Sequence, residues 1–270
     1  MTPFWRVLYE AIQDVLKNGF DSAERLRFWR GRLRTAISHE IPSEHVQQER
    51  LQKVLRYQYR KSMRQAQRTA AARGTSTMDV QRLAPNLQSE LEKRIQISTG
   101  LIKLNRGRMV ERTLQRFEGW MSSIPEGGTR RIVARKTAVH IAKPLRQQSY
   151  EERRLHIDQG HKLVASIDRV IAQNSGAVAM VWHSHWRAPG YDYRPDHKER
   201  DEKIYLLRDS WAIEKGLIAK GSAEYTDEIT APGEEVYCRC KGVYLYALRE
   251  LPASMLTEKG KQALARVKAA

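Results

Sequence analysis

The sequence is poor in cysteine. Its 270 residues hold two, both within Cys238-Arg239-Cys240. A disulfide between them would close too short a loop to be free of strain. We therefore expect free or metal-bound thiols and a reducing compartment. Long apolar runs are also lacking, since the longest, Ala177–Trp182, is far below the roughly 18 residues of a membrane span. We expect no membrane segment and no secretory signal.

Acidic residues are scarce relative to basic ones. The chain has 31 Asp and Glu against 48 Lys and Arg, a net charge of +17. Residues 177–270 are nearly neutral, with 15 basic and 14 acidic side chains, so residues 1–176 carry a net charge of +16. This asymmetry indicates a polyanionic partner such as DNA, RNA or an acidic protein surface. A solubilising surface without a binding task is the alternative.

Recognised catalytic signatures are missing. The sequence contains no glycine-rich phosphate loop, no nucleophile elbow and no nuclease motif. One polar cluster could support acid–base cleavage of a phosphodiester, and it comprises Arg194, Asp196, His197, Glu199 and Asp201. Such residues are common in loops, so we expect no enzymatic activity, with a metal-dependent nuclease as the alternative.

Apolar residues recur at helical spacing through the first two-thirds of the chain. Phe4, Leu8 and Ile12 predict a helix over residues 3–17, and Asp21 or Ser22 can cap a second helix. Residues 43–73 predict a long helix that begins after Pro42. Thr99-Gly100 is expected to break the next helix. Further helices are expected over 108–121, over 129–143 with an end at Pro144, and over 150–174.

The pattern changes after Gly176. Strands are predicted at 177–182, 203–207 and 236–246, with a short helix at 210–216 and a helical tail after Pro252. The expected fold class is therefore α+β, with a predominantly helical N-terminal two-thirds and a small mixed C-terminal module of short antiparallel or mixed strands. We expect a basic helical body over 1–149, the module over 150–250 and a basic helical tail over 251–270.

Basic residues recur every fourth position in the long helix. Arg56, Arg60, Arg64 and Arg68 would line one strip of it, flanked by Lys61. Like charges at this spacing weaken an isolated helix, which favours a phosphate or carboxylate partner. A face that pairs with a neighbouring subunit and a solvated face are the alternatives. A second basic segment adds three candidate nucleic-acid contacts, Arg130, Arg131 and Arg135.

Histidines and both cysteines of the last third form a candidate metal site. Side chains at i and i+2 of a strand share one face, so Cys238 and Cys240 could present two thiolates together. With His197, and with His183 as a fourth ligand, they would give a tetrahedral N/S site for Zn²⁺. The alternative is two buried apolar thiols beside polar surface histidines.

The order of motifs in this region resembles a known family. Trp182 precedes Arg194-x-x-His197, and a Pro232-Gly233 turn leads to Cys238-Arg239-Cys240. Over residues 150–247 this is similar to the phage Mu F-like head morphogenesis, or minor capsid, proteins. The family usually has a glycine-containing turn soon after the histidine, where this chain has residues 198–203, and the pair His183 and His185 is also a departure.

The resemblance implies a structural protein without enzymatic activity, present in few copies at the portal vertex. We expect a phage minor head protein that is made in the host cytoplasm, enters the procapsid and acts in DNA packaging or retention. The implied partners are double-stranded DNA, bound without sequence specificity, and the portal, major capsid or scaffold proteins. The helical body could also form a homo-oligomer. A virion-associated nuclease and an internal protein ejected with the genome are the alternatives.

Overall fold

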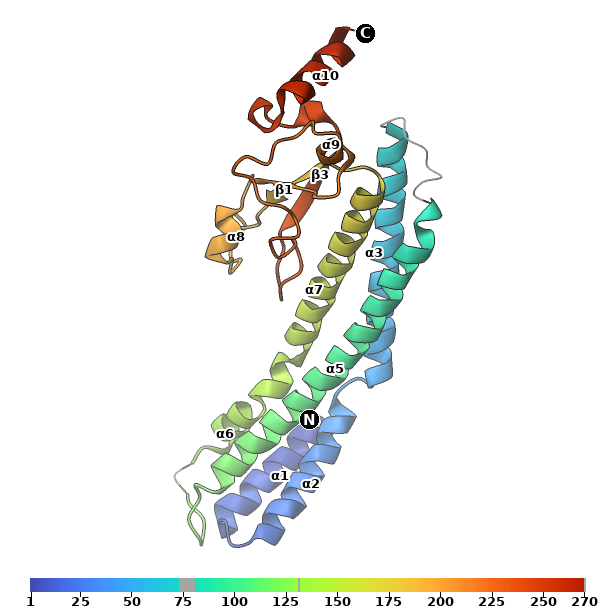
Figure 1. Ribbon diagram of the computed structural model, residues 1–270. Helices are drawn as coiled ribbons and strands as arrows, with labels where there is room; N and C mark the ends of the chain where they lie inside the picture. Colours follow the sequence, from blue (N-terminus) through green and yellow to red (C-terminus); the bar gives the residue numbers. More distant parts are fainter. Residues whose placement is uncertain (73–80, 131, 270) are drawn as a thin grey trace. The chain divides into compact units, whose positions relative to one another are not determined.

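The computed structural model describes residues 1–72, 81–130 and 132–269 (Figure 1). The chain is largely helical up to residue 174, and a small three-stranded sheet follows. The N-terminal helices are α1 (Pro3–Asn18), α2 (Ala23–Glu40), α3 (Glu44–Ala72), α5 (Ala84–Met121), α6 (Ala134–Ile141) and α7 (Lys143–Asn174). The C-terminal elements are β1 (Ala179–His183), α8 (Pro195–Glu199), β2 (Ile204–Leu206), α9 (Trp211–Glu214), β3 (Lys241–Leu245), the 3₁₀ turns η1 (Leu248–Glu250) and η2 (Ala253–Met255), and α10 (Glu258–Ala269). The α+β fold class is thus confirmed.

The chain forms two compact units. One comprises Met1–Gln52 and Gln96–Leu155, and the other comprises Lys53–Ile95 and His156–Ala270. The boundaries between the units fall inside α3, α5 and α7. The division into a helical body over 1–149, a module over 150–250 and a tail over 251–270 stays a prediction. Among the described residues, no helix combines the length and the apolar composition that crossing a membrane requires.

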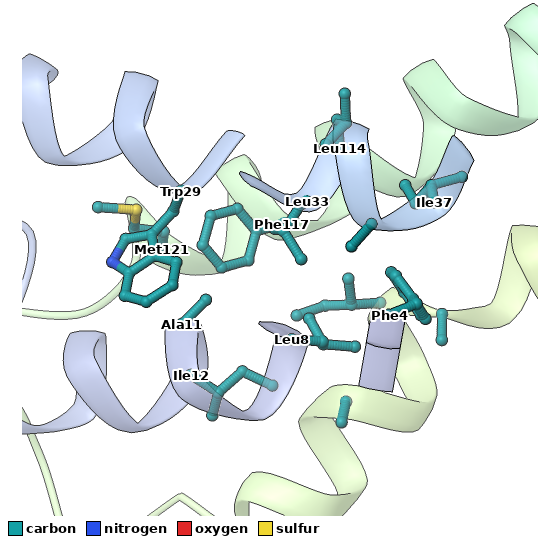
Figure 2. Close-up of a cluster of buried hydrophobic side chains, with 14 of the residues drawn as sticks. Phe4, Leu8, Ala11, Ile12, Trp29, Leu33, Ile37, Leu114, Phe117 and Met121 are labelled. Atoms are coloured by element: carbon teal, nitrogen blue, oxygen red, sulfur yellow. The ribbon is translucent and has the colours of Figure 1, made fainter. Parts of the chain in front are cut away.

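The first unit is organised around one apolar core. Figure 2 shows Phe4 and Leu8 of α1 pointing toward Leu33 of α2 and Phe117 of α5. Their side chains are at most 2% exposed, and full burial of such a side chain contributes about 1.5–3 kcal/mol. The helical spacing read from the sequence therefore marks the buried face of α1. Ser22 is the residue that caps α2, since its Oγ accepts a hydrogen bond from the Arg25 backbone N–H at 3.2 Å.

A predicted helix break and a predicted helix start are wrong. Helix α5 runs through Thr99-Gly100 without a break, because Ile95 and Ile102 on either side are buried. An interior glycine costs only about 1 kcal/mol, which such packing offsets. Helix α6 ends at Ile141, close to the predicted end before Pro144, but α7 already begins at Lys143 and not at residue 150, so that Pro144 lies in its first turn. Proline is tolerated there because the first N–H groups of a helix have no intrahelical partner.

The sheet has the order β2-β1-β3, and both pairings are antiparallel. Alternate side chains point to opposite faces, so the adjacent residues Tyr205 and Leu206 enter two different apolar clusters. Both faces of the sheet are therefore covered. The predicted first and second strands are confirmed with shifted ends. The third is shorter than predicted, because β3 begins only at Lys241 and residues 236–240 form an irregular segment.

Candidate metal centre

His197, Cys238 and Cys240 come together in the second unit. The Nδ1 atom of His197 lies 3.6 Å from Sγ of Cys238 and 3.5 Å from Sγ of Cys240. The three residues are buried, at 2%, 1% and 4% exposure. Their ligand atoms lie within 4.8 Å of one another, so the group could hold a metal ion.

The histidine is positioned by the short helix α8. Pro195 opens this helix in its first turn, and the backbone N–H of Lys198 donates to Arg194 O at 3.1 Å. The ring of His197 meets the indole of Trp182 edge-on, with ring centres 5.2 Å apart. Trp182 is itself 0% exposed on β1. The sheet therefore fixes one wall of the site and orients the imidazole.

The cysteines are positioned by a turn instead of a strand. Gly233 has φ +81°, and a Cβ there would lie 3.1 Å from the Cβ of Ala165, so the turn suits glycine. The backbone N–H of Gly233 points at Sγ of Cys238 at 3.4 Å. Tyr237 adopts φ +60°, and its N–H donates to the buried carboxylate of Asp158 at 2.7 Å. This distant hydrogen bond compensates for a backbone conformation that non-glycine residues rarely adopt.

Carboxylates face the other nitrogen of the histidine. Nε2 of His197 lies 3.4 Å from Oε1 of Glu235 and 3.8 Å from Oδ2 of Asp196. Arg194 holds Glu235 in place through an ion pair of 2.6 Å. With a proton on Nε2, Nδ1 has a free lone pair directed at the thiols. A metal-bound histidine commonly has a carboxylate on its second nitrogen.

The two thiols interact with each other. Their mutual hydrogen bond raises the pKa of Cys238 and lowers the pKa of Cys240, while burial raises both pKa values. One thiolate is therefore favoured at the Cys240 position. A second adjacent thiolate is favoured only when a cation is present to offset their repulsion.

The donor set and its spacing fit Zn²⁺. Zinc–sulfur bonds of about 2.3 Å and zinc–nitrogen bonds of about 2.0–2.1 Å put tetrahedral ligands about 3.6 Å apart. The observed separations of Nδ1 from the two sulfurs, 3.6 and 3.5 Å, match this value. The residues present could therefore supply three ligands of a tetrahedral site.

The structure does not bring His183 into this group. His183 lies exposed at the end of β1, opposite Lys241, and is not among the clustered ligand atoms. Glu235 is a site residue that the sequence did not single out. Its position three residues before Cys238 and two after Gly233 is a weak signal that could have identified it.

Most residues that carry the family resemblance converge on this site. Trp182, Arg194, His197, Gly233, Cys238 and Cys240 are linked by the contacts given above. Two motif residues lie elsewhere: the guanidinium of Arg239 is over the ring of Tyr191, 5.3 Å from the ring centre, and Pro232 lines the cavity beside residues 240–244. Asp201, from the expected acid–base cluster, accepts hydrogen bonds from the Ser184 N–H and the Trp186 Nε1–H, each at 2.8 Å. It therefore supports the loop after β1.

The predicted basic strip is exposed on α3. Its members are Arg56, Arg60, Lys61, Arg64 and Arg68. Within the part of the chain that the structure describes, no carboxylate forms an ion pair with them. In the other unit Arg130 and Arg135 are exposed, while Arg131 lies outside the described residues. The strip therefore has unneutralised positive charge available to a partner.

Chemically, the site joins a buried imidazole, two thiols and a supporting carboxylate within the C-terminal part of the chain. A metal ion at this site would cross-link segments that are distant in sequence. Within the described residues the cluster supplies three ligands, so the fourth tetrahedral position is open. In comparisons with known proteins, no family model, no curated protein and no solved structure matches this chain.

Proposed function

We propose that this chain is a phage minor head protein of the Mu F-like type, which acts at or near the portal vertex. Its C-terminal module is a Zn²⁺-stabilised docking unit. Its exposed basic helix face binds packaged DNA without sequence specificity. The proposal makes the chain a structural component of the virion and no enzyme, with the portal and the major capsid or scaffold proteins as protein partners.

One observation carries this proposal. The motif residues that resemble the family are spread from Trp182 to Cys240, yet they meet around His197. Arg194 contributes through Glu235, its 2.6 Å ion-pair partner, which faces the same imidazole. A motif whose members support one another physically is better explained by a shared architecture than by chance spacing.

The assembly role is tested on purified virions. Quantitative mass spectrometry should find the chain in few copies per particle, and antibody labelling should mark one vertex. A phage that lacks the gene should form defective heads and recover when the gene is supplied in trans. Virions that contain none of the protein would exclude this role.

The DNA role is supported by the strip on α3. Its guanidinium groups recur every fourth residue and have no carboxylate partner among the described residues. Arg64 even turns its Nε to the backbone oxygen of Arg60, at 3.3 Å. Exposed arginines of this kind contact phosphates and release counterions. An acidic protein surface is the competing partner. Titration of the chain with duplex DNA at several salt concentrations tests whether DNA is the partner instead.

A nuclease is the second candidate. Asp196, His197 and Glu235 form another group whose ligand atoms lie within 4.8 Å, and it includes two carboxylates. Carboxylate oxygens suit Mg²⁺ or Mn²⁺. The test is cleavage of duplex DNA by the purified chain with each ion, with His197→Ala as the comparison. Metal-dependent cleavage that the variant lacks would favour the nuclease over the structural role.

A further inference from the structure

Strand β3 forms an edge of the sheet. It pairs with β1 through residues 241–245, and no other described strand pairs with it. Half of the backbone N–H and C=O groups of an edge strand point away from its partner. Proteins usually protect such an edge, because it can pair with another chain.

The free edge of β3 opens into a groove. A cavity of about 1030 Å³ is lined by five consecutive residues, 240–244, and a second cavity of about 590 Å³ by 242–244 together with Tyr246 and Ala247. Successive side chains of a strand point to opposite faces. A cavity that contacts every residue in turn therefore meets the edge of the strand and not one face.

Residues of the helices α3, α5 and α7 line the larger cavity together with β3. Gln65 of α3 and Asp168 of α7 line both cavities, as do Gly242, Val243 and Tyr244 of β3, so the two cavities adjoin. All of these residues belong to the second unit. The groove thus runs along the strand for most of its length.

The groove is predominantly basic. Five cations line its larger cavity, against the carboxylates of Glu90, Asp168 and Glu234. Lys162 pairs with Asp158 at 3.2 Å. Arg169 and Lys241 are exposed and form no ion pair with the residues that the structure describes. Lys241 lies near enough to Asp168 to lower the pKa of that carboxyl group, so the two cations together leave a net positive charge beside the strand edge for a partner.

We propose that this groove binds an extended acidic segment of a protein partner, which adds a strand to the free edge of β3. The backbone of that segment would pair with β3 at the usual strand spacing of about 4.8 Å. Acidic side chains would meet Arg169 and Lys241, and apolar ones would cover Val243, which is 48% exposed. A peptide is favoured over a nucleic acid because only a peptide satisfies an unpaired strand edge. The inference does not rest on the proposed function.

The probe is a fluorescent peptide with the repeat Glu-Ser-Val-Ser, titrated into the full chain and followed by anisotropy. Its glutamate and valine alternate along one face of an extended chain, as Lys241 and Val243 do on β3. We expect saturable binding and slower amide hydrogen exchange in β3. Versions that are N-methylated at every second residue, in both registers, keep the charges and remove the pairing N–H groups. At least one of the two methylated peptides should bind at least about tenfold more weakly than the unmodified peptide. A lysine-for-glutamate peptide should not bind.

Charge reversal tests the same site from the protein side. The double variant Lys241→Glu and Arg169→Glu should weaken binding about tenfold, while Lys103→Glu with Lys136→Glu, exposed in the other unit, should leave it unchanged. Equal affinity for methylated and unmodified peptides would overturn the proposal. It would also fail if duplex DNA alone bound the groove, or if a second copy of the chain occupied it, seen as self-association lost in the Lys241→Glu and Arg169→Glu variant.

Discussion

Nε2 of His197 lies 3.4 Å from Oε1 of Glu235, on the opposite side of the ring from the two thiols. A carboxylate at this position fixes the tautomer and makes the other nitrogen a better ligand. Arg194 binds the same carboxylate at 2.6 Å. Arg194 and Glu235 are therefore placed to support the imidazole through its second nitrogen.

We expect the wild-type chain to bind one Zn²⁺ and to be stabilised by it. At a free concentration about 1,000-fold above the Kd, the gain is about 4 kcal/mol. Cys238→Ser and Cys240→Ser should each lose most of the metal, as measured by elemental analysis, and their thermal unfolding should no longer respond to a chelator. His183→Ala is the matched control and should keep its metal, because His183 lies outside the cluster. A metal-free wild type that is insensitive to chelator would contradict the site.

Glu235→Gln tests the role of the supporting carboxylate. The variant keeps all three ligands and removes the charge that faces Nε2. Loss of such a partner weakens metal affinity about 10–100-fold, which competition with a chromophoric chelator would measure. Glu234→Gln is the control, since that side chain accepts a hydrogen bond from the Ala231 N–H at 2.6 Å. Equal affinities of the two variants would show that Glu235 has no influence on the metal.

The helical body could be predicted because its signal is periodic. Phe4, Leu8 and Ile12 mark the buried face of α1 without any knowledge of the partners of that face. The break expected at Thr99-Gly100 failed for a tertiary reason. Burial of Ile95 and Ile102 on the same helix outweighs the weak local preference of one glycine.

The metal site could be predicted only in part. His197, Cys238 and Cys240 could be identified because histidine and cysteine are the usual ligands of Zn²⁺ and the sequence has only two cysteines, spaced to share a face. Their geometry could not, because Tyr237 adopts φ +60° and interrupts the expected strand. That conformation depends on Asp158, which is 79 residues away. No local pattern encodes so distant a contact, and Glu235 was missed for the same reason.

Replacing Arg56, Arg60, Arg64 and Arg68 by glutamine should weaken the binding of duplex DNA. Each phosphate contact that is lost should reduce the slope of log affinity against log salt by about 0.9. Fluorescence anisotropy at several salt concentrations gives both quantities. A control with the same change in charge replaces four exposed basic residues of the last third of the chain by glutamine, Lys203, Arg249, Lys259 and Lys261. If the two variants had equal slopes of log affinity against log salt, the strip would not be part of the DNA interface.

Gly128 makes a close approach that tests the packing of the first unit. It has φ +81°, and a Cβ there would lie 2.1 Å from the backbone oxygen of Leu16. Gly128→Ala should therefore lower the free energy of unfolding by about 1–3 kcal/mol. Gly31→Ala is the control, because nothing lies within 4 Å of a Cβ at this position in α2. It should stabilise the chain by about 0.5–1 kcal/mol. Denaturant unfolding gives the free energy of unfolding of both variants. If Gly128→Ala left this free energy unchanged, the close contact with Leu16 would be contradicted.

Asp168 should make stability depend on pH. Burial against the groove wall raises the pKa of its carboxyl group to about 6, while Lys241 nearby lowers it. More than a third of the residue nevertheless remains open to solvent, so we expect a smaller effect than at a closed site. The folded pKa lies above the unfolded value of about 3.9. The contribution of the neutral carboxyl group is thus present below pH about 4 and is lost as the pH rises through about 6.

Asp168→Asn removes this titration. The variant should gain stability relative to the wild type between pH about 4 and about 7, because its amide never acquires the charge that burial disfavours. Urea unfolding with a chelator present measures the difference without a contribution from metal release. Asp209→Asn, at an exposed position of the same unit, is the control and should track the wild type at every pH. A difference between Asp168→Asn and the wild type that stays constant across this range would mean that the groove does not favour the neutral carboxyl group.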